Sequence, residues 1–138
     1  MQDSETRATK ALVERLFAAY EQGDSQQFFD HVTDDVHWTV TGDNPLSGEY
    51  FSKSEFFEAT FERLEAVLKE PVRPSVRRIT AEGDVAVVEW HGRATSIVDR
   101  PYDNDYCWVI RVDGGRIVEV TAYLDGALVE DLLRTTEG

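Results

Sequence analysis

Metal-binding and disulfide-forming side chains are scarce in this chain. Its 138 residues include one cysteine and three histidines, which are scattered along the sequence. A single cysteine excludes an internal disulfide, and the histidines do not combine with it into a recognisable metal-ligand pattern. We therefore expect no metal ion and no organic cofactor.

Basic residues and long hydrophobic runs are also scarce. The chain has 14 Lys and Arg against 27 Asp and Glu, and its net charge of −13 repels nucleic-acid phosphates and anionic lipids. No apolar run approaches the roughly 18 residues of a membrane span, and residues 1–7 are not typical of a signal peptide. We expect a cytoplasmic protein that binds neither nucleic acid nor membranes. Because the acidic residues are spread along the chain, they favour solubility over recognition of a basic ligand.

The sequence does contain enough apolar material for one core. Hydrophobic residues make up 41% of the chain and aromatic residues 11%, which at this length allows a sizeable buried core. There is no internal repeat and no low-complexity linker. We predict a single domain over residues 1–138.

The front half of the chain has helical spacing. A first helix is predicted to end before Gly23, a short second helix to begin at the capping sequence 24–27, and a third to run from the capping sequence 52–55 to Leu68. Between the second and third helices, residues 36–40 alternate apolar and polar side chains, which predicts a half-buried strand.

The back half is predicted to be an antiparallel meander, and its clearest element is a β-hairpin at 102–125. Two runs rich in β-branched and aromatic residues flank Asp113-Gly114-Gly115, which is a strong hairpin signal. A three-residue loop with one left-handed glycine keeps apolar residues on one face, whereas a two-residue loop would mix apolar and polar residues. The inner face then pairs Ile110 with Val118, Trp108 with Val120, Tyr106 with Ala122, and Asn104 with Leu124.

The preceding strand can be placed against this hairpin in two ways. If the connecting loop lies at 99–101, Trp90 faces Ile110 on the inner face and Glu89 points outward. A one-residue shift through a bulge would instead turn Glu89 inward. We favour the first phase, because it sets small residues such as Gly92 against large ones.

Several motifs spread over nearly the whole chain occur in combination. They are Asp-Asp-Val-His-Trp at 34–38, Pro-Leu-Ser-Gly at 45–48, and the closing segments 102–111 and 115–125. With them the chain resembles the SnoaL-like, ketosteroid-isomerase-related group of the nuclear transport factor 2-like superfamily. The resemblance implies an α+β cone-shaped barrel, in which a curved antiparallel β-sheet wraps around three N-terminal helices, with a pocket at its open end and usually a homodimer. The group includes polyketide cyclases, ketosteroid isomerases, limonene epoxide hydrolases and proteins without catalysis.

The catalytic residues of those enzymes do not carry over to this chain. The position of the isomerase's general-base aspartate falls on Val40, and that of its oxyanion-hole tyrosine falls on Leu16. Its second oxyanion donor falls on Trp108, and an aspartate of the epoxide hydrolases falls on Ala122. None of these side chains can remove a proton beside a carbonyl or hold the resulting enolate.

The predicted ligand pocket has apolar walls and a few polar groups, as is typical of small-molecule sites. The sequence leaves open whether its tryptophans contact a ligand or only fill the core, and whether Asn104 and Tyr106 merely bond to each other. The residues expected to line the pocket are Phe17, Tyr20, Trp38, Val40, Trp90, Asn104, Tyr106, Trp108, Val120, Ala122 and Leu124.

Two classes of function are compatible with such a pocket. The first is an enzyme that uses acid/base chemistry on a small apolar metabolite, with Tyr106, Asn104 and Asp125 as candidate catalytic residues. The second is a non-catalytic ligand-binding or dimeric assembly module whose pocket is filled. An inward carboxylate or histidine would favour the enzyme. Further carboxylate candidates are Asp43, Glu49 and Glu89, while His37 and His91 are expected on the outer face and His31 on the surface.

The outer face of the hairpin is expected to form a homodimer interface. Val109, Ile117 and Tyr123 are predicted to lie there among charged residues. Such a surface is too apolar to be wholly exposed to water.

Overall fold

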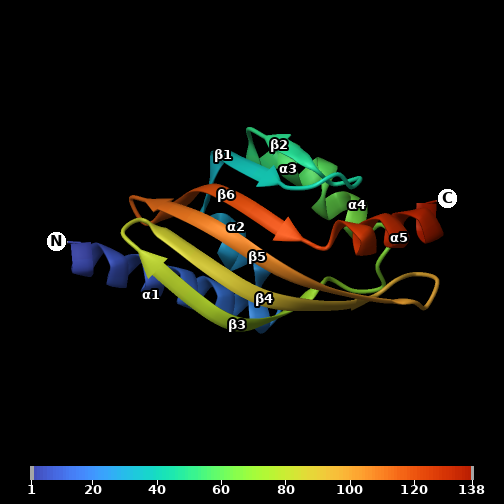
Figure 1. The fold of residues 1–138 in the computed structure, drawn as a ribbon, viewed down its shortest axis with the longest axis horizontal. Helices are drawn as coiled ribbons and strands as arrows, with labels where there is room; N and C mark the ends of the chain where they lie inside the picture. The colour runs from blue at the N-terminus through green and yellow to red at the C-terminus, as the bar shows by residue number, and fades with distance from the viewer. Residues whose placement is uncertain (1, 138) are drawn as a thin grey trace.

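The computed structural model describes residues 2–137, which form a curved, unclosed six-stranded sheet with helices packed against it (Figure 1). The strand order is β2-β1-β6-β5-β4-β3, and the predicted α+β fold with N-terminal helices is confirmed. In chain order the elements are α1 (Gln2–Glu21), α2 (Ser25–Asp30), β1 (Val32–Val40), β2 (Gly48–Tyr50), α3 (Lys53–Ala59), α4 (Phe61–Glu65), β3 (Arg73–Glu82), β4 (Val85–Thr95), β5 (Pro101–Asp113), β6 (Arg116–Leu124) and α5 (Gly126–Glu137).

The sheet is not wholly antiparallel. Strand β1 pairs in parallel with β6, so that Trp38 lies beside Val120 and Val40 beside Ala122. The other neighbouring strands are antiparallel. The front strand is therefore placed next to the last strand of the meander, and the residues that the sequence assigned to one inner face meet there.

The predicted helix starts are correct, but the third helix is shorter than expected. Asp24 accepts a hydrogen bond from the backbone N–H of Gln27 at 3.1 Å, and Ser52 accepts one from Glu55 at 3.1 Å. The helix that follows Ser52 breaks at Thr60, whose φ of −124° and ψ of −72° are not helical. The Thr60 hydroxyl donates to the carbonyl of Phe56 at 2.7 Å, a back-bond that is known to bend helices. The result is two short helices, α3 and α4.

Helix α5 was not predicted. It follows directly on the end of β6 and buries Val129, Leu132 and Leu133. This spacing of three and four residues is a helical apolar stripe. No helix in the described part of the chain is long and apolar enough to cross a membrane.

The closing hairpin has the predicted faces but not the predicted loop. Gly114 and Gly115 both have positive φ, 60° and 77°, so the turn contains two residues instead of three. The Gly-Gly pair permits this because neither residue has a Cβ. A bulge at Val118 then restores the alternation, and Trp108 lies opposite Ala122 instead of Val120. The bulge also turns Ile117 into the core, where it is fully buried, so its predicted place on the outer face is wrong.

The side chains of β4 likewise lie on the predicted faces of the sheet, but they lie opposite other residues of β5 than predicted. Trp90 lies opposite Tyr106 instead of Ile110, and Gly92 lies opposite Asn104. The connecting loop is longer than predicted and is closed by a hydrogen bond from Ser96 N–H to the Arg100 carbonyl at 2.8 Å. Because a shift by an even number of residues keeps every side chain on its face, the inner face survives the error.

Candidate ligand-binding site

A small cavity of about 60 Å³ lies inside the cone, between the concave face of the sheet and the helices. Eight of its lining residues were expected there from the sequence: Tyr20, Trp38, Val40, Trp90, Tyr106, Trp108, Ala122 and Leu124. Seven were missed: Leu46, Phe56, Thr60, Phe61, Leu64, Val72 and Tyr102. Most of the missed residues come from the loop and helices between β1 and β3, whose positions the alternation of the strands cannot reveal.

Three expected pocket residues do not line this cavity. Phe17 packs behind it, with its ring centroid 5.2 Å from that of Phe28, because α1 presents this side chain to the core. Val120 is fully buried between its neighbours on β1 and β5. Asn104 is also buried, but its amide is used in hydrogen bonds at the end of β6.

The cone interior is largely filled by aromatic rings. Trp90 stacks on Tyr106 with centroids 4.1 Å apart, and Trp38 stacks on Phe56 at 4.0 Å. Trp108 meets both indoles edge-on at 5.1 Å. Offset stacks and edge-to-face contacts are the favourable arrangements for such rings. The tryptophans therefore fill the core and border the small cavity at the same time.

A closed polar network lies where β5 and β6 meet α5. The Asn104 amide donates to the Tyr102 hydroxyl at 3.0 Å and to the Asp125 carbonyl at 3.1 Å, and its oxygen accepts from Asp125 N–H at 3.1 Å. The hydroxyls of Tyr102 and Tyr106 are 3.0 Å apart. Asn104 and Tyr106 thus belong to one network, as expected, but Tyr102 links them. The Asp125 carboxylate points elsewhere, accepting from Ala127 N–H at 3.0 Å at the start of α5.

The two tyrosine hydroxyls of this network are neutral. Burial raises the pKa of Tyr102 and of Tyr106 above the ordinary value of a phenol. Two hydroxyl hydrogens are available, and only one can lie between the two oxygens. The pair can therefore donate one hydrogen bond to a ligand in the cavity.

Other polar atoms at the cavity have no partner. The indole N–H groups of Trp38 and Trp90 are buried and have no acceptor among the described residues. The hydroxyl of Tyr20 forms no hydrogen bond within the described part of the chain, although Tyr20 is only 7% exposed, and burial raises its pKa. Fully buried donors without partners, such as the two indole N–H groups, are uncommon in folded proteins and call for a specific explanation.

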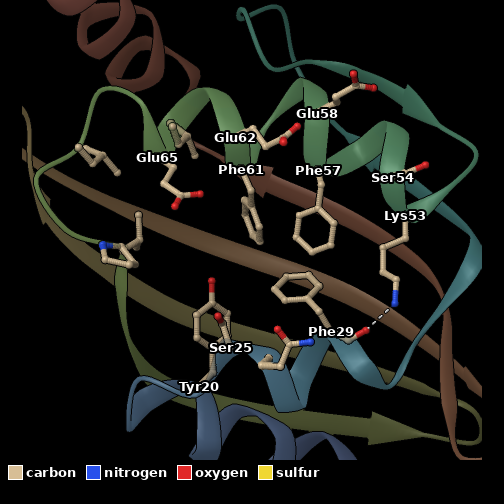
Figure 2. Close-up of a pocket in the computed structure, with 15 residues that line it drawn as sticks. Tyr20, Ser25, Phe29, Lys53, Ser54, Phe57, Glu58, Phe61, Glu62 and Glu65 are labelled. Carbon is tan, nitrogen blue, oxygen red and sulfur yellow. Dashed lines mark hydrogen bonds between the residues drawn. The ribbon is translucent and has the colours of Figure 1, made fainter.

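A larger groove of about 770 Å³ opens between α1–α2 and α3–α4 (Figure 2). It adjoins the inner cavity, because Tyr20, Phe61, Leu64 and Val72 line both. Its other apolar lining residues are Phe29, Phe57, Leu68 and Pro71, and its polar ones are Ser25, Gln26, Lys53, Ser54, Glu58, Glu62 and Glu65.

The remaining acid/base candidates lie away from the cavity. His37 lies on the outer face, 3.0 Å from the exposed Glu49, and His91 lies 2.8 Å from Asp105. Glu89 points outward to Arg78 at 2.6 Å. None of the described residues that line the inner cavity is a carboxylate or a histidine.

Two further acid/base candidates also lie away from the cavity. Asp43 is exposed, while His31 is half-buried instead of lying on the surface, with Nδ1 2.9 Å from the Gln27 carbonyl oxygen. Within residues 2–137 no cluster of His, Cys, Asp and Glu side chains is arranged to hold a metal ion.

Comparison with known proteins agrees with this architecture. The family model for the SnoaL-like domain matches residues 13–120. No curated protein matches the chain.

Solved structures with the same fold cover nearly the whole chain. An NTF2-like protein from Burkholderia thailandensis superposes with a TM-score of 0.76 at 21% identity, over 91% of this chain and 96% of that one. TerC, co-crystallized with polyporic acid, gives 0.75 at 18% identity, over 92% and 98%. IdmH from Streptomyces antibioticus, a candidate polyketide cyclase, gives 0.70 at 19% identity, over 91% and 98%. Since the family model spans most of the sequence, the chain belongs to the SnoaL-like domain family, and it has the fold of NTF2-like proteins.

Proposed function

We propose that this protein binds a small, largely apolar molecule at the cone mouth without catalysing its conversion. The apolar body of the ligand lies in the groove, and an oxygen acceptor on the ligand reaches the inner cavity. The observation that carries the proposal is the pair of buried indole N–H donors of Trp38 and Trp90, which have no acceptor among residues 2–137 and whose side chains line a cavity that adjoins an apolar groove.

The energetics favour an oxygen-bearing ligand. A buried donor without a partner costs about 1–3 kcal/mol, because it has lost its hydrogen bonds to water. A carbonyl or hydroxyl oxygen that accepts from one of these indole N–H groups would remove part of this cost. The groove volume of about 770 Å³ lies within the range of small-molecule sites, which are mostly apolar with a few placed polar groups.

An enzyme is the second candidate, and the Tyr102–Tyr106 pair favours it. Two neutral hydroxyls 3.0 Å apart in an apolar cavity can donate to a carbonyl oxygen on which negative charge develops. Proton transfer also needs a base, and the described cavity lining offers neither a carboxylate nor an imidazole. Binding without turnover therefore has the stronger support.

A pair of isosteric probes tests the binding proposal. Acetylnaphthalene and isopropenylnaphthalene differ only in a C=O or a C=CH₂ group, so only the ketone can accept a hydrogen bond. Prodan, a neutral fluorescent naphthyl ketone, reports binding through its blue shift and is displaced by both probes. We expect the ketone to bind about tenfold more tightly than the alkene, the gain from one buried hydrogen bond.

Substitutions assign the donor in the same experiment. Trp38→Phe or Trp90→Phe should remove the preference for the ketone. Tyr50→Phe is the matched control, because the Tyr50 hydroxyl donates to the Leu46 carbonyl at 2.7 Å and is already occupied. Equal affinities of the folded parent for ketone and alkene would contradict the proposal.

We also propose that two copies of the chain associate through the outer face of the sheet. Phe51 and Tyr123 are 62% and 49% exposed, and Phe51 stacks on His37, which points outward from β1. Exposed aromatic side chains of this kind favour a self-complementary interface. Light scattering should give a dimer mass for the parent and a monomer mass for Tyr123→Asp. A parent that stays monomeric at micromolar concentration would refute the dimer.

A further inference from the structure

We propose that the groove selects ligands with a basic nitrogen, in which an ammonium group is attached to an apolar body. This inference rests on the proposed function, because it adds the charge of the ligand that occupies the same groove. It is carried by a row of unpaired carboxylates on one wall and by an unpartnered hydroxyl, Tyr20, on the other.

The carboxylates belong to α3 and α4. Glu58 lies on α3, and Glu62 and Glu65, three residues apart, lie on one side of α4; all three line the groove. Within residues 2–137 none of their side chains has a hydrogen bond or an ion pair. Figure 2 shows the carboxylate of Glu65 hanging from α4 into the groove. In the same view the Glu58 carboxylate points up, away from the groove floor. This wall therefore carries three carboxylates against one ammonium group, that of Lys53.

Nearby basic residues are committed elsewhere. Lys53 also lines the groove, but its ammonium donates to the carbonyls of Phe29 and Val32 at 3.0 Å each and lies 3.7 Å from Asp34. Arg63 binds the carboxylate of Glu137 at 2.8 Å, on the side of α5. Neither cation neutralises the three glutamates.

Carboxylates on the outer sheet face are in a different situation. Glu89 pairs with Arg78 and Glu119 with Arg111. An excess of acidic residues by itself favours solubility. Unpaired carboxylates beside apolar groove residues are a more specific arrangement. A molecule with an ammonium group and an apolar body can pair with the carboxylates and bury its apolar part against the groove.

The opposite wall supplies a polar atom that suits an ammonium group. In Figure 2 the Tyr20 hydroxyl points up into the groove from α1, across from α4. Tyr20 is 7% exposed, and its hydroxyl has no partner among the described residues. It can accept an N–H bond from an ammonium. The rings of Phe57 and Phe61 also line the groove, and aromatic faces attract cations within about 6 Å.

Three probes with one ring system and different charges test the inference. Naphthylethylamine is cationic at neutral pH, naphthylethanol is neutral and naphthylacetate is anionic. Their affinities follow from displacement of prodan and from calorimetry. At low ionic strength we expect the amine to bind about tenfold more tightly than the alcohol, and the acetate to bind more weakly than both. The preference should shrink severalfold when the ionic strength is raised to about 0.5 M.

Matched variants locate the charge. The triple substitution Glu58→Gln, Glu62→Gln, Glu65→Gln should abolish the preference for the amine while leaving the affinity for the alcohol within about twofold, since exposed charges contribute little to neutral binding. The control triple Glu14→Gln, Glu82→Gln, Glu130→Gln removes the same charge from exposed glutamates outside the groove. The control should keep the preference.

The outcomes separate this inference from the proposed function. If the alcohol binds and the amine binds no more tightly, the inference is wrong and the binding function stands. The preference for the amine could survive in the variant with Glu58, Glu62 and Glu65 replaced, or be lost equally in that variant and in the control variant. In either case the selection does not come from this wall, and the inference is also wrong. If none of the probes binds to the folded parent, the proposed function fails as well.

Discussion

The two polar regions of the cone interior contain similar side chains and differ in how well these are satisfied. Near α5, the Asn104 amide bonds to the Tyr102 hydroxyl and to the backbone of Asp125, and the Tyr102 hydroxyl also bonds to that of Tyr106. Toward the groove, the indole N–H groups of Trp38 and Trp90 are buried without a partner in residues 2–137, and the Tyr20 hydroxyl forms no hydrogen bond there either. A satisfied network fixes structure, whereas unsatisfied donors lower stability unless a ligand uses them. The first region is therefore structural, and the second is available for recognition.

Alkaline unfolding should distinguish the two regions most strongly. The pKa values of Tyr20, Tyr102 and Tyr106 are raised in the folded protein above the ordinary phenol value of 10.0. The unfolded state then loses these protons first, so stability falls as the pH rises above that value. We expect cooperative unfolding in this range, with tyrosinate absorbance and circular dichroism changing together.

A comparison of two variants sharpens this prediction. A phenolate at Tyr102 would accept hydrogen bonds from Asn104 and Tyr106, whereas a phenolate at Tyr20 would have no donor. Tyr20→Phe should therefore move the alkaline transition to higher pH by more than Tyr102→Phe does. Equal shifts would mean that the two regions are equally satisfied.

Removal of Asn104 should cause the next largest effect. Asn104→Ala leaves Asp125 N–H and its carbonyl without their side-chain partners at the start of α5, and it creates a small cavity in a buried site. We expect a loss of about 3 kcal/mol in the free energy of unfolding, measured in urea. Asp103→Ala, at the exposed neighbouring position, is the control. An Asn104→Ala variant as stable as the parent would show that the network is not structural.

Loss of single hydroxyls should give the smallest effects. Tyr102→Phe should cost about 1 kcal/mol of unfolding free energy, because it breaks bonds to Asn104 and Tyr106. Tyr20→Phe should cost less than about 0.5 kcal/mol, since its hydroxyl has no bond to lose. Thermal and urea unfolding of both variants provide the comparison. A larger cost for Tyr20→Phe would reverse the assignment of the two regions.

Face assignments could be predicted from the sequence because they depend only on alternation. Trp90, Tyr106 and Trp108 were placed on the inner face correctly although both strand registers were wrong. Register depends on the number of residues in loops and bulges. Neither the bulge at Val118 nor the closure of the loop at Ser96 has a clear signal in the sequence.

The missed residues have separate causes. Tyr102 was not assigned to the pocket, although continuing the alternation from Asn104 would have placed it there. Helix α5 could have been found from the spacing of Val129, Leu132 and Leu133. The groove depends on how α1–α2 and α3–α4 pack against each other, which no local pattern specifies. The dispersed acidic residues favoured solubility in the sequence, and only the fold separates the paired carboxylates from those of the groove.

The most direct test of ligand recognition observes the indole N–H groups themselves. Proton–nitrogen NMR gives one side-chain resonance for each tryptophan, and Trp→Phe variants assign them. On titration with acetylnaphthalene we expect the resonance of Trp38 or Trp90 to move downfield as its N–H gains an acceptor, and to stay in place with isopropenylnaphthalene. Acetylnaphthalene could instead bind saturably while both indole resonances take the same positions as with isopropenylnaphthalene. That result would contradict recognition by these donors.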